Sequence, residues 1–332
     1  MLIRREKPWT IPPNMVTPEP AFLNRRQFLS QTAAGAAGVV LIGGGCAPRE
    51  AGDQQAVAGS GKSAPLPKLK PTPTSDLYPA KRNPAFELDR PVTAERVAAR
   101  HNNYYEFTTN KAAVWKLAEG FEIRPWQVEV GGLVHKPGKF DIDELVRTMP
   151  LEERLYRFRC VEAWAMAVPW TGFPFKALIE KVQVKSDAKF VRMVTVHRPA
   201  QMPGIKQMGG YQWPYYEGLS MAEASNELTL LATGIYGHEL PAQHGAPIRL
   251  VVPWKYGYKS IKSIVKIEFT ADRPHTFWND LTPNEYDFAA NVNPEVPHPR
   301  WSQASERMIG IGERRPTLLY NGYGQQVAHL YA

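Results

Sequence analysis

Thirty prolines and 25 glycines are spread along this chain of 332 residues, and they favour a fold with many irregular connections. Proline breaks helix interiors, and glycine costs about 1 kcal/mol relative to alanine inside a helix. A helical bundle is therefore disfavoured. The chain is 43% hydrophobic, so it has enough apolar material for one large domain or two smaller ones.

Periodicity predicts a mixture of short strands and short helices. Alternating or continuous apolar runs predict strands over 127–130, 190–196, 248–252 and 263–269. Helices are expected over 93–99, 142–148 and 175–182, the first of them with Thr93 as its cap. No internal repeat is visible, and no transmembrane helix is expected after the N-terminal region.

The N-terminal region resembles a twin-arginine export signal. Arg25 and Arg26 precede a run of small, weakly apolar residues over 32–45, which is too short to span a bilayer. Such signals carry proteins that are already folded, often around a cofactor. We prefer cleavage near residues 56–58, although Cys46 could instead be lipidated.

Three segments follow from this pattern. Residues 1–58 are predicted to be the signal segment. Residues 59–87 are rich in proline, alanine and lysine and are predicted to be a tether, because they hold too little apolar surface to order themselves. The folded domain is predicted over 88–332.

The formal charge of +8 is scattered rather than clustered. A nucleic-acid surface is therefore disfavoured, and an anionic cofactor or a locally positive site fits better. A candidate is the stretch 253–262, which places three lysines, a glycine and a serine in ten residues. Lysine ammonium groups and backbone amides can hold a phosphate. Lys255 and Lys259 are expected to face solvent.

Cys160 would be the only cysteine left after cleavage of the signal segment. A lone thiol in an oxidising compartment is expected to be buried, catalytic or bound to a metal. Arg157 and Arg159 flank it in sequence and could help to keep the sulfur deprotonated.

Several separated motifs, in order along residues 88–330, resemble the sulfite-oxidase-like molybdenum enzymes, most closely their twin-arginine-exported branch of periplasmic methionine-sulfoxide reductases. The motifs that carry the resemblance are residues 158–164, 245–249, 253–257, 298–304 and 317–323.

This resemblance implies an α+β fold of the sulfite-oxidase catalytic type, with mixed sheets, and one molybdenum with one molybdopterin. It implies reduction of methionine sulfoxide in oxidised envelope proteins, which is the reversible step of methionine oxidation. It also implies periplasmic localisation and a haem-containing integral membrane subunit that delivers electrons from quinone.

The resemblance also implies the site residues. Cys160 matches the thiolate that ligates molybdenum, so it is both the metal ligand and the catalytic residue. The implied pterin-binding residues are Asn102, Tyr105, Glu106, Thr195, His244, Arg249, Ser260, Ile261 and Lys262. The last three match the stretch that holds the terminal phosphate. Some relatives carry asparagine where this chain has His244, and either side chain can hydrogen-bond a pterin.

Two alternatives stay open at this point. Sulfite oxidation shares the fold and the metal, since substrate choice is set by the pocket. A metal-free envelope binding module would use the tether and the aromatic surface, but it leaves Cys160 and the lysine cluster unexplained.

Overall fold

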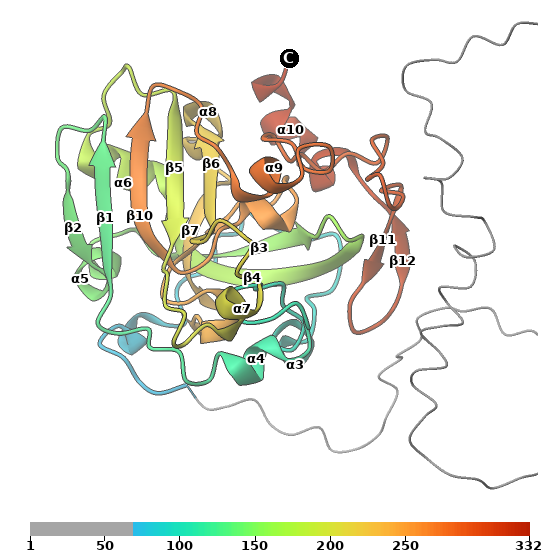
Figure 1. The fold of residues 1–332 in the computed structure, drawn as a ribbon, viewed down its shortest axis with the longest axis horizontal. Coiled ribbons are helices and arrows are strands. Elements are labelled where there is room, and N and C mark those ends of the chain that lie inside the picture. Colours follow the sequence, from blue (N-terminus) through green and yellow to red (C-terminus); the bar gives the residue numbers. More distant parts are fainter. Residues whose placement is uncertain (1–68) are drawn as a thin grey trace, which may run out of the picture. The chain divides into compact units, whose positions relative to one another are not determined.

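The computed structural model describes residues 69–332 (Figure 1). The predicted signal segment and residues 59–68 of the predicted tether lie outside the described residues. No helix within 69–332 is long and apolar enough to cross a membrane.

The first sheet has five strands that stand side by side in the order β2-β1-β10-β5-β6 (Figure 1). Its β1–β10 pair is parallel and its other pairs are antiparallel. The strands are β1 (Gln127–Gly132), β2 (Gly138–Asp141), β5 (Phe190–Thr195), β6 (Tyr216–Ser220) and β10 (Ile264–Thr270).

The second sheet has seven strands and is also mixed. Strands β11 and β4 are parallel, and all other strand pairs of this sheet are antiparallel. Its path is β12-β11-β4-β7-β8, with β3 paired to β4 and β9 paired to β7. The strands are β3 (Glu152–Arg159), β4 (Trp164–Pro174), β7 (Leu230–Ile235), β8 (His238–Glu239), β9 (Arg249–Val251), β11 (Ser305–Met308) and β12 (Arg314–Pro316).

Short helices connect the strands. The α-helices are α3 (Glu95–Ala98), α4 (Val114–Leu117), α5 (Ile142–Arg147), α6 (Phe175–Val182), α7 (Pro203–Gln207), α8 (Met221–Ala224), α9 (Phe277–Leu281) and α10 (Gly324–Val327). The 3-10 turns are η2 (Ser75–Leu77), η3 (Ala242–His244), η4 (Gly257–Lys259), η5 (Leu319–Gly322) and η6 (Ala328–Leu330).

The predicted strands and helices are confirmed to within two residues at most ends, but the predicted cap of the first helix is wrong. Helix α3 begins at Glu95 after Ala94, with no side-chain cap. Thr93 instead binds strand β4, where its hydroxyl accepts from the Ala167 amide at 3.0 Å. By contrast, α5 has a side-chain cap, since Asp141 accepts from the amides of residues 143 and 144.

The tether prediction is wrong for residues 69–87, which are part of the folded unit. Thr74 is only 1% exposed. Its hydroxyl and that of Ser75 donate to the Glu239 carboxylate at 2.7 and 2.8 Å. Tyr78 donates to the Thr233 hydroxyl at 2.7 Å. Polar contacts order this segment, so its low apolar content did not predict whether it is folded.

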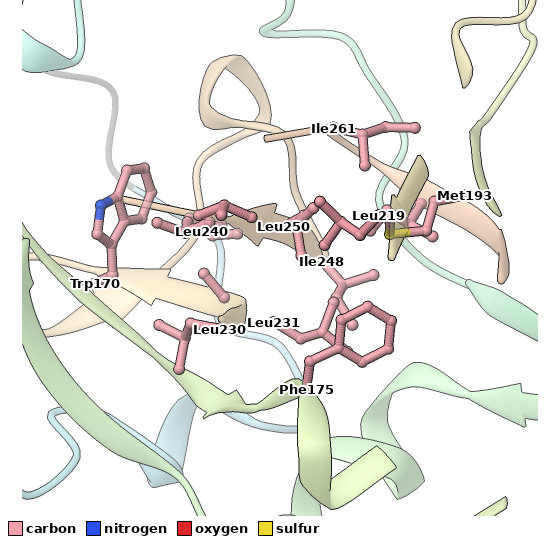
Figure 2. Close-up of a cluster of buried hydrophobic side chains, with 14 of the residues drawn as sticks. Trp170, Phe175, Met193, Leu219, Leu230, Leu231, Leu240, Ile248, Leu250 and Ile261 are labelled. Atoms are coloured by element: carbon pink, nitrogen blue, oxygen red, sulfur yellow. The ribbon is translucent and has the colours of Figure 1, made fainter. Parts of the chain in front are cut away.

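Side chains from both sheets form one buried apolar cluster (Figure 2). Met193 and Leu219 come from the first sheet, whereas Trp170 and Leu230 come from the second. Phe175, at the start of α6, is buried in the same cluster. Packing of these apolar side chains against one another therefore joins the two sheets.

Lys255 and Lys259 are buried, which contradicts the expectation that they face solvent. Lys255 is 1% exposed, and its ammonium donates to Glu223 at 2.5 Å. It also donates to the carbonyl of Ala289 at 2.6 Å. Lys259 is 0% exposed and lies 2.9 Å from the carboxylate of Glu217. These lysines therefore stabilise the fold through buried ion pairs rather than forming a surface clamp.

We expect Lys255→Met to lower the free energy of unfolding by about 3–5 kcal/mol, because it leaves the Glu223 carboxylate buried without its cation. Urea unfolding followed by tryptophan fluorescence measures the change. Lys176→Met is the control, since Lys176 and Glu180 form an exposed pair 3.9 Å apart. That control should change stability by less than about 1 kcal/mol. Equal effects of the two substitutions would contradict the buried role of Lys255.

Candidate active site

One cavity brings together residues that are far apart in the sequence. Of the ten predicted site residues, eight line it: Asn102, Tyr105, Glu106, Cys160, His244, Arg249, Ile261 and Lys262. They come from the turn before α4, the β3–β4 connection, η3, the start of β9 and the loop before β10. The structure therefore gathers most of the predicted set around one space.

Cys160 lies in the tight connection between β3 and β4. Its amide donates to the Trp164 carbonyl at 2.9 Å, and its carbonyl accepts from the Ala163 amide at 3.1 Å. Ala163 closes the turn with a φ of 63°, in the left-handed region. The Val161 carbonyl accepts from the Trp301 indole at 2.8 Å and from the Gln303 amide at 2.7 Å. These contacts fix the backbone that carries the thiol.

The Cys160 sulfur is surrounded by polar donors. The Asn103 side-chain amide lies 3.3 Å from it, and the Glu162 backbone amide lies 3.4 Å from it. The Glu162 carboxylate accepts from Asn103 at 3.1 Å and from the Trp164 indole at 3.1 Å. It also pairs with Lys111 at 3.0 Å. Burial favours the neutral acid, but these hydrogen bonds and the Lys111 charge outweigh it and lower the pKa of Glu162.

The flanking arginines bind other partners, and the Arg159 charge favours the thiolate without outweighing the effect of burial. Arg157 lies 2.9 Å from Asp89. Arg159 is fully buried, donates to Gln303 at 2.8 Å and pairs with Glu306 at 3.3 Å. Burial, followed by the Glu162 charge, raises the pKa of the Cys160 thiol to about 12, and the Arg159 charge opposes this rise. A coordinated metal, which displaces the thiol proton, would be needed to make a thiolate here.

The start of α7 positions the backbone of Tyr105 and Glu106. Gly204 packs so closely that a Cβ there would lie 2.1 Å from the Tyr105 carbonyl oxygen. The Ile205 amide donates to the Glu106 carbonyl at 3.2 Å. A residue without a side chain at position 204 therefore lets this turn approach the cavity.

Arg249 connects the two loops on the opposite side of the cavity. Its guanidinium donates to the carbonyls of His244 at 2.9 Å and Ser260 at 3.0 Å. Gly245 follows with a φ of 93°, and a Cβ at this position would lie 2.6 Å from the Lys262 side chain. Glycine is thus required both by the backbone conformation and by the approach of Lys262.

Two cationic groups, Arg249 and Lys262, and two carboxylates, Glu106 and Glu162, line the cavity. Within residues 69–332 neither cation lies within ion-pair distance of a carboxylate, and the half-buried Lys262 has its Nζ 5.2 Å from the centre of the Tyr104 ring. Burial, then repulsion by Arg249, lowers the pKa of Lys262 to about 7. Burial raises the pKa of Glu106 to about 7, although Lys262 opposes this shift. An anion bound here would relieve the repulsion between the two cations.

His244 also has an unused polar atom. Its Nε2 is buried and has no hydrogen-bond partner among residues 69–332. Burial and the Arg249 charge lower the pKa of His244 to about 3, so the ring is neutral at pH 7. A neutral imidazole can donate one hydrogen bond and accept another, which suits a heterocyclic ligand.

Two predicted site residues do not line the cavity. The Thr195 hydroxyl donates to the Lys262 carbonyl at 2.8 Å. The Ser260 hydroxyl accepts from the Val252 amide at 3.2 Å, and its side chain is fully buried. In the described structure both of them hold the loop that carries Lys262.

Sequence reasoning missed Asn103 and Glu162, which lie next to Cys160. Asn103 lies next to the predicted Asn102 but received no role, because its partner is 57 residues away in the sequence. Glu162 follows Cys160 by two residues, and this short separation in sequence could have indicated that it lies beside the thiol. The aromatic residues Trp164, Trp278 and Tyr286 complete the cavity wall.

Comparisons with known proteins agree with this geometry. The family model of the oxidoreductase molybdopterin-binding domain matches residues 116–278. The protein-methionine-sulfoxide reductase catalytic subunit MsrP of Burkholderia mallei (strain ATCC 23344) is 45% identical over 325 residues, which are 97% of this chain and 93% of that protein. The matched domain contains Cys160 and the predicted positions from Thr195 to Lys262.

Among solved structures, the sulfane dehydrogenase SoxCD from Paracoccus pantotrophus is similar over 61% of this chain and 47% of its own. The sequence identity is 16%, and the TM-score is 0.41.

Proposed function

This chain belongs to the family of protein-methionine-sulfoxide reductase catalytic subunits, and from that premise we propose that it reduces methionine sulfoxide residues of oxidised proteins to methionine. The observation that carries the proposal is the buried Cys160 thiol, which lines the same cavity as Arg249 and Lys262 inside a molybdopterin-binding oxidoreductase domain. The expected α+β fold is confirmed by the two mixed sheets and by the family match.

The residues present fit a molybdenum-pterin cofactor. A thiolate is a soft ligand that suits molybdenum better than a carboxylate would. No group of three or more His, Cys, Asp or Glu side chains in residues 69–332 could hold a metal ion. A metal at Cys160 would therefore take its other ligands from the pterin. Lys262, Arg249 and the unpartnered His244 nitrogen offer charge and hydrogen bonds to an anionic heterocycle.

Sulfoxide reduction consumes two electrons and two protons, and it releases the sulfoxide oxygen as water. When bound, the molybdenum cofactor would supply the two-electron, oxygen-accepting chemistry of this reaction. The protein positions the reacting groups. Asn103 holds the Cys160 sulfur and the Glu162 carboxylate together, and the aromatic wall keeps bulk water away.

The test of this function is steady-state reduction of an oxidised protein with a reduced dye as electron donor. We expect turnover of methionine sulfoxide, and sulfite oxidation at least about a hundredfold slower under matched conditions, since recognition of an oxidised side chain and of a small dianion needs different pockets. Amino-acid analysis measures the methionine recovered. Faster turnover of sulfite than of sulfoxide would contradict the proposal.

Lys262→Ala tests the cofactor-binding role of this lysine. A charge-assisted contact to an anion contributes roughly 1.5–3 kcal/mol, so we expect about a ten- to hundredfold loss of cofactor affinity. The purified variant should carry little pterin, while its activity per bound molybdenum stays close to that of the wild type. Lys266→Ala is the control, because Lys266 is about a third exposed and pairs with Glu268 at 3.0 Å. Full pterin content with lost activity would instead assign Lys262 to the substrate.

We further propose that the electrons come from a haem-containing integral membrane subunit fed by quinone. Support comes from the name of the Burkholderia relative, which is called a catalytic subunit and hence has a separate partner. A membrane partner would explain how a chain with no membrane-spanning helix in residues 69–332 could draw on quinone.

Periplasmic localisation through the twin-arginine pathway is the matching proposal for targeting, and the Arg25-Arg26 pair supports it. We expect replacement of both arginines by lysine to leave folded, cofactor-loaded precursor in the cytoplasm. Cell fractionation followed by immunoblotting measures the distribution. Normal accumulation of the double variant in the periplasm would show that another export route is used.

A further inference from the structure

An outer cavity, here called the vestibule, adjoins the inner cavity. The two share His101, Tyr105, Glu162, Trp164, Trp278 and Tyr286, and the vestibule adds Lys111, Tyr211, Arg300, Trp301 and Arg307. Since Glu162 and Trp164 belong to the Cys160 turn, the vestibule is a direct approach to the thiol from outside.

The vestibule is cationic. Three cations and a single carboxylate line it. Lys111 is paired with Glu162 at 3.0 Å, and Arg300 is paired with Glu285 at 2.6 Å. Arg307 is exposed and has no ion-pair partner within residues 69–332. Its positive charge is therefore available to a ligand.

The backbone holds Arg307 beside the Cys160 turn. Its amide donates to the Ala163 carbonyl at 2.9 Å, and it stands opposite Trp164 in the parallel β11–β4 pair. Burial lowers the pKa of His101 to about 4, with further contributions from Lys111 and Arg307. His101 is thus uncharged at pH 7, and the field in the vestibule comes from the lysine and the arginines.

Aromatic rings form the wall between the vestibule and the inner cavity. The Trp278 ring lies 5.3 Å from that of Tyr105 and 5.1 Å from that of Tyr286. Sulfur-containing side chains make favourable contacts with aromatic rings. The rings therefore suit the side chain of an oxidised methionine, while the cations outside them face the residues next to it in the chain.

We propose that the vestibule selects methionine sulfoxides with acidic neighbours in sequence, and that Arg307 is a specificity-determining residue for this choice. This inference rests on the proposed function and names its substrate class. Opposite charges at such an exposed surface change affinity by a modest factor, and salt screens them.

The test uses peptides of equal length in which one methionine sulfoxide is flanked by glutamate, glutamine or lysine, with free methionine sulfoxide as a fourth substrate. A reduced dye supplies the electrons to the cofactor-loaded full-length enzyme. We expect the wild type to show the highest kcat/KM with the glutamate peptide and the lowest with the lysine peptide. We expect Arg307→Gln to lower kcat/KM for the glutamate peptide about three- to fivefold through KM, with kcat unchanged.

Two further variants test whether the effect depends on the positive charge and on its position at residue 307. Arg307→Lys keeps the charge and should retain the preference. Lys139→Gln removes an exposed cation from β2, in the other sheet, and should leave all four substrates unchanged. Arg307→Gln should also leave turnover of free methionine sulfoxide unchanged, and 0.5 M salt should remove most of the preference of the wild type.

An equal loss for all three peptides in Arg307→Gln would overturn the inference, because it would indicate a structural role for the arginine. Equal kcat/KM of the wild type for the three peptides would also overturn it, while turnover of free methionine sulfoxide would leave the proposed function standing. Failure of the wild type to reduce any of the four substrates would instead refute the proposed function, and this inference with it.

Discussion

The structure around the cavity depends on two cations, the buried Arg249 and the half-buried Lys262, that share one space and form no ion pair with a carboxylate of residues 69–332. Burial of a charge without a partner is costly, and a second like charge nearby adds to the cost. Burial and the repulsion by Arg249 lower the pKa of Lys262, and this shift expresses the cost. The fold holds the cations in place through Arg249, whose guanidinium joins two loops. Binding of an anionic cofactor would compensate the two positive charges, so the site would favour an anionic ligand over a neutral one.

The part of the cavity wall that carries Cys160 is held by hydrogen bonds to its backbone. The β3–β4 turn presents Cys160, and its backbone is tied to Trp164 within the turn and to Trp301 and Gln303 from the C-terminal region. Arg159 extends this anchoring through its buried pair with Glu306. These contacts hold the backbone of the Cys160 turn in place. Under the proposed function, Cys160 would be the protein ligand of the metal, and the metal would displace the thiol proton.

Much of this arrangement could be predicted from the sequence where the signal is local. Alternation over 263–269 predicted β10, and the motif around Cys160 predicted its place in the site. The contacts that depend on distant partners could not be predicted. Lys255 lies within a lysine-rich stretch that suggests a surface, but its partner Glu223 is 32 residues away. Residues 69–87 read as a polar tether because nothing local shows that Glu239 accepts their hydroxyls.

The account makes Cys160 the one protein ligand of a molybdenum that otherwise binds the pterin. The most direct test is X-ray absorption at the molybdenum K-edge, which counts the sulfur atoms around the metal, on the wild type and on metal-loaded Cys160→Ser. The account predicts one sulfur fewer in the variant, with the pterin sulfurs retained, because the substitution removes a single soft ligand with little change in volume. An unchanged sulfur count in the metal-loaded variant would contradict it.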